Sequence, residues 1–108
     1  MKQQQVFLAR FPFSNQADYK IRPIAIISNN KLNEEHNFVW ACPITTKQTK
    51  PEFELEIREK DFTGELKSKS FVRTDTIATM EKTLILKQIG EISKPLFEKL
   101  KTGLIKNL

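Results

Sequence analysis

Three places along the chain set charged or hydroxyl side chains at the ends of apolar runs, where they could act on an anionic substrate. Arg22 stands at the entry to one run, and Thr45-Thr46 at the exit of another. Arg73 and Asp75 stand two residues apart at the end of a third, so their side chains share one face of a predicted strand. A guanidinium donates paired hydrogen bonds to anions, a hydroxyl donates or accepts, and a carboxylate can take up a proton.

Each of these features also has an ordinary structural explanation. Arg22 could be a surface cation, and Thr45-Thr46 could start a loop through local hydrogen bonds. Arg73 and Asp75 could form an exposed ion pair that stabilises the fold by less than about 1 kcal/mol. Asp18-Tyr19, in the first predicted loop, suit a turn. The residue types alone leave both explanations open.

The elements that must position these side chains are predicted to be short strands. Apolar and β-forming runs predict strands at 6–13, 24–27, 38–42 and 84–89, and Phe71-Val72 with Ile77 fit a further pair of strands. Residues 52–58 alternate strictly, which places Phe53, Leu55 and Ile57 on a core face and Glu52, Glu54, Glu56 and Arg58 on a solvent face. Gly64 lies in a predicted hairpin connection, and the apolar neighbours of Trp40 predict a core position for it.

Two helices are expected. Ser28-Asn29-Asn30 offers an N-cap for a short helix over 31–36, and Ser93 caps a final helix with Pro95 in its first turn. The apolar face of that final helix is predicted to comprise Leu96, Phe97, Leu100, Leu104, Ile105 and Leu108. Gly103 within it costs about 1 kcal/mol relative to alanine, which indicates close packing. We therefore predict a mainly β (α+β) single domain over 1–108, a small antiparallel sheet or barrel with a helix on it.

Composition favours a small cytoplasmic protein and is compatible with a polyanionic partner. The 108 residues carry a formal net charge of +5, which suits nucleic acid, although a lysine-rich soluble surface explains it equally well. No apolar run approaches the roughly 20 residues that span a bilayer, and no signal peptide is evident. Cys42 is the only cysteine, so an internal disulfide is excluded and a reducing compartment fits.

The sequence argues against several kinds of chemistry. His36 is the only histidine, which excludes a two-histidine ribonuclease, and one histidine with one cysteine cannot form a His/Cys zinc cage. No glycine-rich phosphate loop or H-E-x-x-H motif occurs. We expect neither a metal nor another cofactor.

The order of the features resembles the PemK/MazF toxin family. The segment 20–29, with Arg22-Pro23 before an apolar run, is similar to the family's first block, and 41–46, with Pro43-Ile44-Thr45, to its second. The segment 71–77 resembles its third block, and 89–93 with the amphipathic helix its ending. These four blocks, in the family's order, cover nearly the whole chain.

The resemblance implies a twisted SH3-like barrel of the CcdB/MazF kind with a C-terminal helix, a homodimer, and a cognate antitoxin. It implies an endoribonuclease that cleaves single-stranded RNA, such as mRNA, at short sequences. In one branch of the family the positions of Arg22 and Thr45 carry cleavage, and in another those of Arg73 and Asp75. Further positions that match RNA-binding residues are Asp18, Tyr19, Lys20, Thr46 and Lys47.

The chemistry that this implies needs no metal, because the ribose 2′-OH attacks the adjacent phosphate. Arg22 and Arg73 would stabilise the charge of the transition state, since arginine stays protonated. Thr45 would hold the phosphate through its hydroxyl. Asp75 is the candidate base for the 2′-OH, a role for which its pKa must be raised.

Departures from the family pattern keep alternatives open. Gln4-Gln5 replaces a usual Gly-Asp, Gln16 and Asp18 occupy a region where some members have histidine, and Ala78 replaces a common arginine. A relic without activity and a non-catalytic nucleic-acid-binding barrel therefore remain as alternatives. A gyrase poison resembling CcdB is disfavoured, because such toxins rely on a tryptophan near the C-terminus, whereas Trp40 is the only tryptophan here.

Overall fold

The structure is a computed structural model that describes residues 1–12 and 19–108. Those residues form eight strands, two α-helices and three single 3-10 turns. The strands are β1 Gln5–Pro12, β2 Tyr19–Ile26, β3 Phe38–Thr45, β4 Glu54–Ile57, β5 Phe62–Gly64, β6 Ser70–Arg73, β7 Ala78–Glu81 and β8 Ile85–Ile92. The helices are α1 Asn30–Glu35 and α2 Lys94–Lys106, and the 3-10 turns are Pro51–Phe53, Glu59–Asp61 and Lys82–Leu84.

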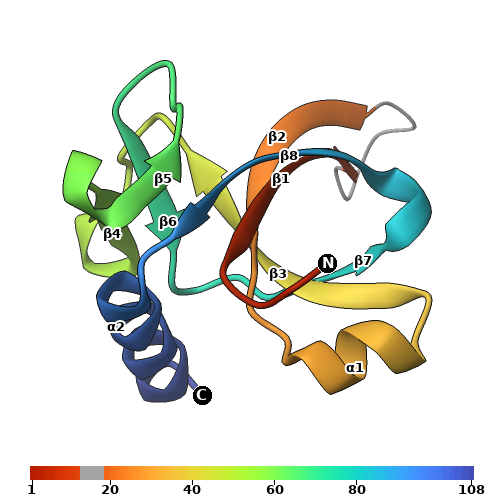
Figure 1. The fold of residues 1–108 in the computed structure, drawn as a ribbon. Coiled ribbons are helices and arrows are strands. Elements are labelled where there is room, and N and C mark those ends of the chain that lie inside the picture. Colours follow the sequence, from red (N-terminus) through yellow and green to blue (C-terminus); the bar gives the residue numbers. More distant parts are fainter. Residues whose placement is uncertain (13–18) are drawn as a thin grey trace.

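The strands form one antiparallel sheet that curls into a nearly closed barrel (Figure 1). Their order is β4-β6-β3-β2-β1-β8-β5, with β7 paired to β3. The two end strands, β4 and β5, are joined by the short Glu59–Asp61 turn, so the chain itself brings the ends of the sheet together. Register shifts in β1 against β8 supply the local bending that closure needs. The predicted antiparallel barrel with a C-terminal helix is confirmed.

The core lies on both faces of the central strands. One cluster lies between the sheet and α2, with Cys42, Val72 and Leu100 among its fully buried members. A second cluster fills the barrel around Ile24, Ile26 and other side chains of β2, β3 and β7. Because neighbouring residues of β2 and β3 enter opposite clusters, these strands are apolar on both faces, and the sequence shows them as continuous apolar runs.

Both helices begin as their caps predict. The Asn29 side chain accepts a hydrogen bond from Leu32 N at 2.9 Å, and Ser93 Oγ accepts one from Leu96 N at 3.3 Å. The face of α2 is narrower than predicted, because Ile105 is 62% and Leu108 93% exposed, while the other four predicted residues are buried. The predicted close packing of Gly103 is confirmed: an added Cβ would lie 2.9 Å from Thr74 Cγ2.

Several predicted element boundaries are wrong. The second strand begins at Tyr19 instead of Ile24, the predicted hairpin connection around Gly64 contains β5, and Ile77 lies outside the strands. The alternating strand is only β4, because the chain makes a turn at Pro51–Phe53 in which Phe53 N bonds to Lys50 O at 2.9 Å. Phe13, the predicted end of the first strand, lies outside the described residues.

Two side chains face the opposite way from the prediction. Trp40, expected in the core, is 42% exposed on β3, whereas Glu54, expected on a solvent face, is 5% exposed. Both departures have one cause. Alternation assigns side chains to two faces, but packing and sheet curvature decide which face is covered at each point.

Candidate active site

Arg22 and Thr45 meet because they lie on neighbouring strands. The ladder between β2 and β3 pairs Ile24 with Pro43, and the same register continued by two residues places Arg22 opposite Thr45. Both residues line the same two surface hollows. Thr45 also makes the local contacts expected of a loop start, since its Oγ1 accepts a hydrogen bond from Lys47 N at 3.2 Å.

Arg73 joins them through the ladder between β3 and β6, which pairs Thr45 with Phe71, two residues before Arg73. The first hollow measures about 290 Å³ and is lined by Phe11, Arg22, Pro43, Thr45, Arg73 and Thr76. Three of the four predicted catalytic residues therefore line one hollow, although more than 50 positions separate Arg22 from Arg73 along the chain.

Asp75, the fourth predicted catalytic residue, is connected to the hollow by its hydrogen bonds to Arg73. The guanidinium donates from Nε to Oδ1 at 2.9 Å and from Nη2 to Oδ2 at 2.8 Å, and Thr76 Oγ1 donates to Oδ1 at 3.0 Å. The hydrogen bonds from Arg73 lower the pKa of Asp75, and the bond from Thr76 lowers it further. The same pair raises the pKa of Arg73.

A role for Asp75 as the base requires a raised pKa, whereas its pKa in the structure is lowered. A carboxylate that accepts three hydrogen bonds and pairs with a guanidinium has a weak affinity for a proton at neutral pH. Asp75 is placed to hold Arg73 in a fixed orientation, as a bidentate partner does.

A second hollow adjoins the first and shares Arg22 and Thr45 with it. It measures about 350 Å³, and its further lining residues include Lys20, Thr46 and Lys47, all three of them predicted RNA-binding residues. The two hollows together bring Arg22, Arg73, Lys20 and Lys47 to one surface. Such a set of cations favours the binding of a nucleic-acid backbone, which is a chain of phosphates.

The remaining predicted residues are described only in part. Tyr19 is the first residue of β2, and its side chain lies outside the described part of the structure. Asp18 also lies outside the described residues. Within residues 1–12 and 19–108, no group of three His, Cys, Asp or Glu side chains is placed to hold a metal ion. In the same part of the chain, neither helix is long and apolar enough to cross a membrane.

A family model describes almost all of the chain. The model of the PemK-like, MazF-like toxin of type II toxin-antitoxin systems matches residues 2–108. The chain belongs to this family. The resemblance inferred from the four sequence blocks is thereby confirmed.

Solved structures have the same fold as this PemK/MazF-like chain. An endoribonuclease from Mycobacterial species is 21% identical with a TM-score of 0.79, over 99% of this chain and 89% of the other. MazF from Deinococcus radiodurans is 17% identical with a TM-score of 0.80, over 98% and 94%. A mycobacterial endoribonuclease in complex with its cognate antitoxin is 22% identical with a TM-score of 0.77, over 99% and 91%. No curated protein matches the chain by sequence.

Three residues of the first hollow in this PemK/MazF-like chain, Phe11, Pro43 and Thr76, are not among the site residues predicted from the sequence. Phe11 reaches it from β1, and Thr76 from the segment between β6 and β7. The period of β1 groups Phe11 with Phe7 and Ala9, which indicates a core face, and both Phe7 and Phe11 do pack against the second core cluster. Phe11 thus combines a core contact with a place in the site, a combination that periodicity cannot reveal.

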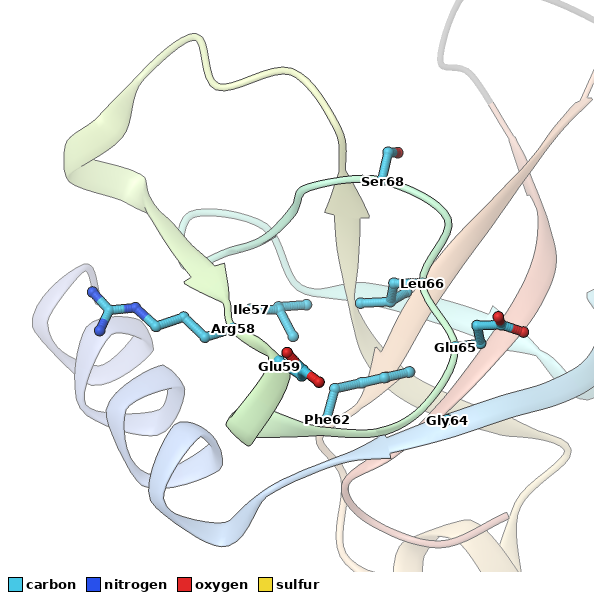
Figure 2. A pocket seen from close by; sticks show the side chains of 8 residues that line it. All are labelled: Ile57, Arg58, Glu59, Phe62, Gly64, Glu65, Leu66 and Ser68. Atoms are coloured by element: carbon cyan, nitrogen blue, oxygen red, sulfur yellow. The ribbon is translucent and has the colours of Figure 1, made fainter.

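Another hollow of about 350 Å³ lies apart from these residues, where β4 and β5 approach (Figure 2). Ile57, Phe62 and Leu66 point into it, and Arg58 and Glu59 lie at its margin. It contains none of the predicted site residues and only one positively charged side chain, Arg58. The cationic side chains suited to binding a phosphodiester line the first and second hollows, which share Arg22, instead.

Proposed function

We propose that this chain is an endoribonuclease toxin that cleaves single-stranded RNA, mRNA in particular, at short sequences and without a metal. The observation that carries the proposal is the meeting of Arg22, Thr45 and Arg73 at one hollow in a member of the PemK/MazF family. It is supported by solved structures of the same fold that are themselves endoribonucleases.

The reaction follows from the groups at the hollow. The ribose 2′-oxygen attacks the adjacent phosphorus, a bond from phosphorus to O2′ forms, and the bond from phosphorus to O5′ breaks. The leaving 5′-oxygen takes a proton from water, and the 2′-OH proton passes to water. The products are a 2′,3′-cyclic phosphate and a 5′-hydroxyl.

Catalysis in this scheme is mainly electrostatic. Arg22 and Arg73 donate to the phosphate oxygens as charge gathers on them, and Thr45 Oγ1 orients the phosphate. Removing one such donor from an active site typically costs about 10²–10³ in rate. Asp75 orients Arg73 and is not the base. The residue pairs of the two family branches, Arg22 with Thr45 and Arg73 with Asp75, thus act together at a single hollow.

RNA contacts extend from the first hollow into the second. Phe11 offers a ring on which a base could stack, and Lys20, Thr46 and Lys47 lie beside the path of the phosphates. We assign Tyr19 and Asp18 to the same path on the family pattern alone.

We also propose a homodimer and a cognate antitoxin, acting in the cytoplasm where mRNA is translated. A MazF from Deinococcus radiodurans has been solved together with MazE, and the mycobacterial endoribonuclease with its cognate antitoxin. An acidic, partly disordered antitoxin segment would complement the cationic hollows and exclude RNA from them. Light scattering of the purified protein tests the dimer.

The decisive experiment incubates the purified protein with a long single-stranded RNA in EDTA and maps the new ends. Arg22→Ala is compared with Arg58→Ala, an arginine of the distant hollow. We expect cuts at a recurring short sequence that end in cyclic phosphate, retained by Arg58→Ala and lost by folded Arg22→Ala.

Three results would contradict the proposal. Unchanged cleavage by folded Arg22→Ala would remove Arg22 from the site. RNA that is bound but left intact by the wild-type protein would favour a non-catalytic RNA-binding barrel, and RNA that is neither bound nor cut would favour a toxin that binds protein.

A further inference from the structure

Glu54, the first residue of β4, carries a buried carboxylate close to the site. The residue is 5% exposed, and its Oε1 accepts a hydrogen bond from Lys50 N at 3.0 Å. Its Oε2 is buried and has no hydrogen-bond partner among the described residues. A buried carboxylate is costly unless its charge is compensated. The position of Glu54 therefore calls for a cation nearby.

Arg73 is that cation. It lies directly opposite Glu54 in the ladder between β4 and β6. Directly opposite residues of antiparallel strands project from the same face, with Cβ atoms about 4.5–5.5 Å apart. The pKa of Arg73 is raised chiefly by its hydrogen bonds to Asp75, and the charge of Glu54 raises it further.

We propose that Glu54 is a positioning residue for Arg73, holding from within the sheet the guanidinium that Asp75 binds nearer the surface. The inference rests on the proposed ribonuclease function, because it gives Glu54 a part in orienting a group of that site. Two carboxylates beside one guanidinium leave this cluster with a net negative charge. Arg73 accordingly contributes through its orientation, while Arg22, Lys20 and Lys47 attract the RNA.

The proposal predicts that Glu54→Gln lowers kcat without raising KM. The amide keeps the shape and an oxygen for Lys50 N but removes the charge that confines Arg73. Misplacement of a catalytic group by about 1 Å can cost up to about 10²-fold in rate, so we expect kcat to fall by about tenfold or more. KM should stay constant or fall, because one negative charge near the phosphates is gone.

Glu56→Gln is the matched control. Glu56 is exposed on the same strand, 3.9 Å from Lys69 Nζ, and faces no residue of the site. This variant should keep the wild-type kcat. In a double-mutant cycle, Glu54→Gln should lower kcat in the wild-type background and have no further effect in Arg73→Ala.

A spectroscopic measurement separates this inference from the ribonuclease proposal. The Nε–Hε signal of Arg73 is recorded by NMR in the protein without RNA. In Glu54→Gln we expect that signal to shift and its hydrogen to exchange faster, while the Arg22 signal stays in place. If Glu54→Gln does not fold, Glu54→Asp, which withdraws the charge by one methylene, should move the same signal.

The outcomes are distinct. An unchanged Arg73 signal in the folded variant overturns the positioning role, whether or not the protein cuts RNA. Additive losses in the double-mutant cycle overturn it as well, since they would show that Glu54 acts independently of Arg73. A wild-type protein that leaves RNA intact while the Arg73 signal responds to Glu54 overturns the ribonuclease proposal and retains the Glu54–Arg73 coupling.

Discussion

Arg73 and Asp75 form a bidentate pair, in which Nε and Nη2 of the guanidinium both donate to the carboxylate. The pair fixes the plane of the guanidinium and uses two of its nitrogens, so Nη1 is the nitrogen that these bonds leave for a phosphate. The side chains are 29% and 26% exposed, which places the pair at the surface of the site instead of in the core. Its chief effect is therefore on orientation, and its effect on stability is small.

The effect of Asp75 on stability should depend on pH in a defined direction. Arg73 lowers the folded-state pKa of Asp75 below its ordinary value of 3.8, so the stabilisation is complete above that value and is lost as pH falls through the lower, folded-state pKa. At pH 7 we expect the free energy of unfolding of Asp75→Asn to be lower than that of wild type by less than about 1 kcal/mol, so that the variant unfolds at a slightly lower temperature. Below pH 3.8 the difference should close. Thermal unfolding from pH 7 to pH 2 measures it, and a difference that grows in acid would contradict the pairing.

The pH dependence of cleavage tests whether Asp75 acts as the base. A base with a raised pKa gives an acid limb near neutrality, whereas the Arg73 pair keeps Asp75 ionised there. We expect no such limb from Asp75 between about pH 5 and 8. The test is kcat against pH for wild type and Asp75→Asn. If wild type shows an acid limb near neutrality that Asp75→Asn lacks, Asp75 is the base after all.

The C-terminal end of α2 braces the segment that carries Arg73 and Asp75. Gly103 packs on the Thr74 side chain, and Asn107 Nδ2 donates to Thr74 O at 2.9 Å. We expect Gly103→Ala to destabilise the protein, because overpacking costs about 1–3 kcal/mol and exceeds the gain of about 1 kcal/mol in helix propensity.

Thr74→Ser supplies the control for this clash, because it removes Cγ2 and keeps the hydroxyl. In the Thr74→Ser background, Gly103→Ala should lower the free energy of unfolding by less, or should even raise it. Urea unfolding of the four proteins measures the coupling, and equal effects of Gly103→Ala in both backgrounds would show that the two side chains do not compete for space.

Cys42 should be inert while the protein is folded. Burial, and after it the charge of Asp75, raises the pKa of the Cys42 thiol to about 12. Since the thiolate is the reactive form, iodoacetamide at pH 8 should modify Cys42 only as fast as the protein unfolds. Mass spectrometry follows the reaction, with the urea-unfolded protein as the reactive reference. Rapid modification of the native protein would mean that this part of the core opens.

Local features of the fold could be predicted from the sequence, because their causes lie within a few residues. The caps at Asn29 and Ser93 and the apolar runs of β2 and β3 each act through neighbours along the chain or one helical turn away. The family pattern then placed Arg22, Thr45, Arg73 and Asp75 together as site residues. Arg22, Thr45 and Arg73 line the first hollow and Asp75 is bonded to Arg73, while the catalytic roles of the four stay predictions.

Only the tertiary structure decided how the faces of the strands are used. Alternation along 52–58 put Glu54 among solvent-facing residues, but closure of the barrel buries it opposite Arg73. The apolar neighbours of Trp40 could not show that its side chain lies on an uncovered part of β3. The sequence by itself determined which residue types alternate, cap and pair locally. Which faces are covered, and the lowered pKa of Asp75, depend on contacts that exist only once the strands have paired and curled.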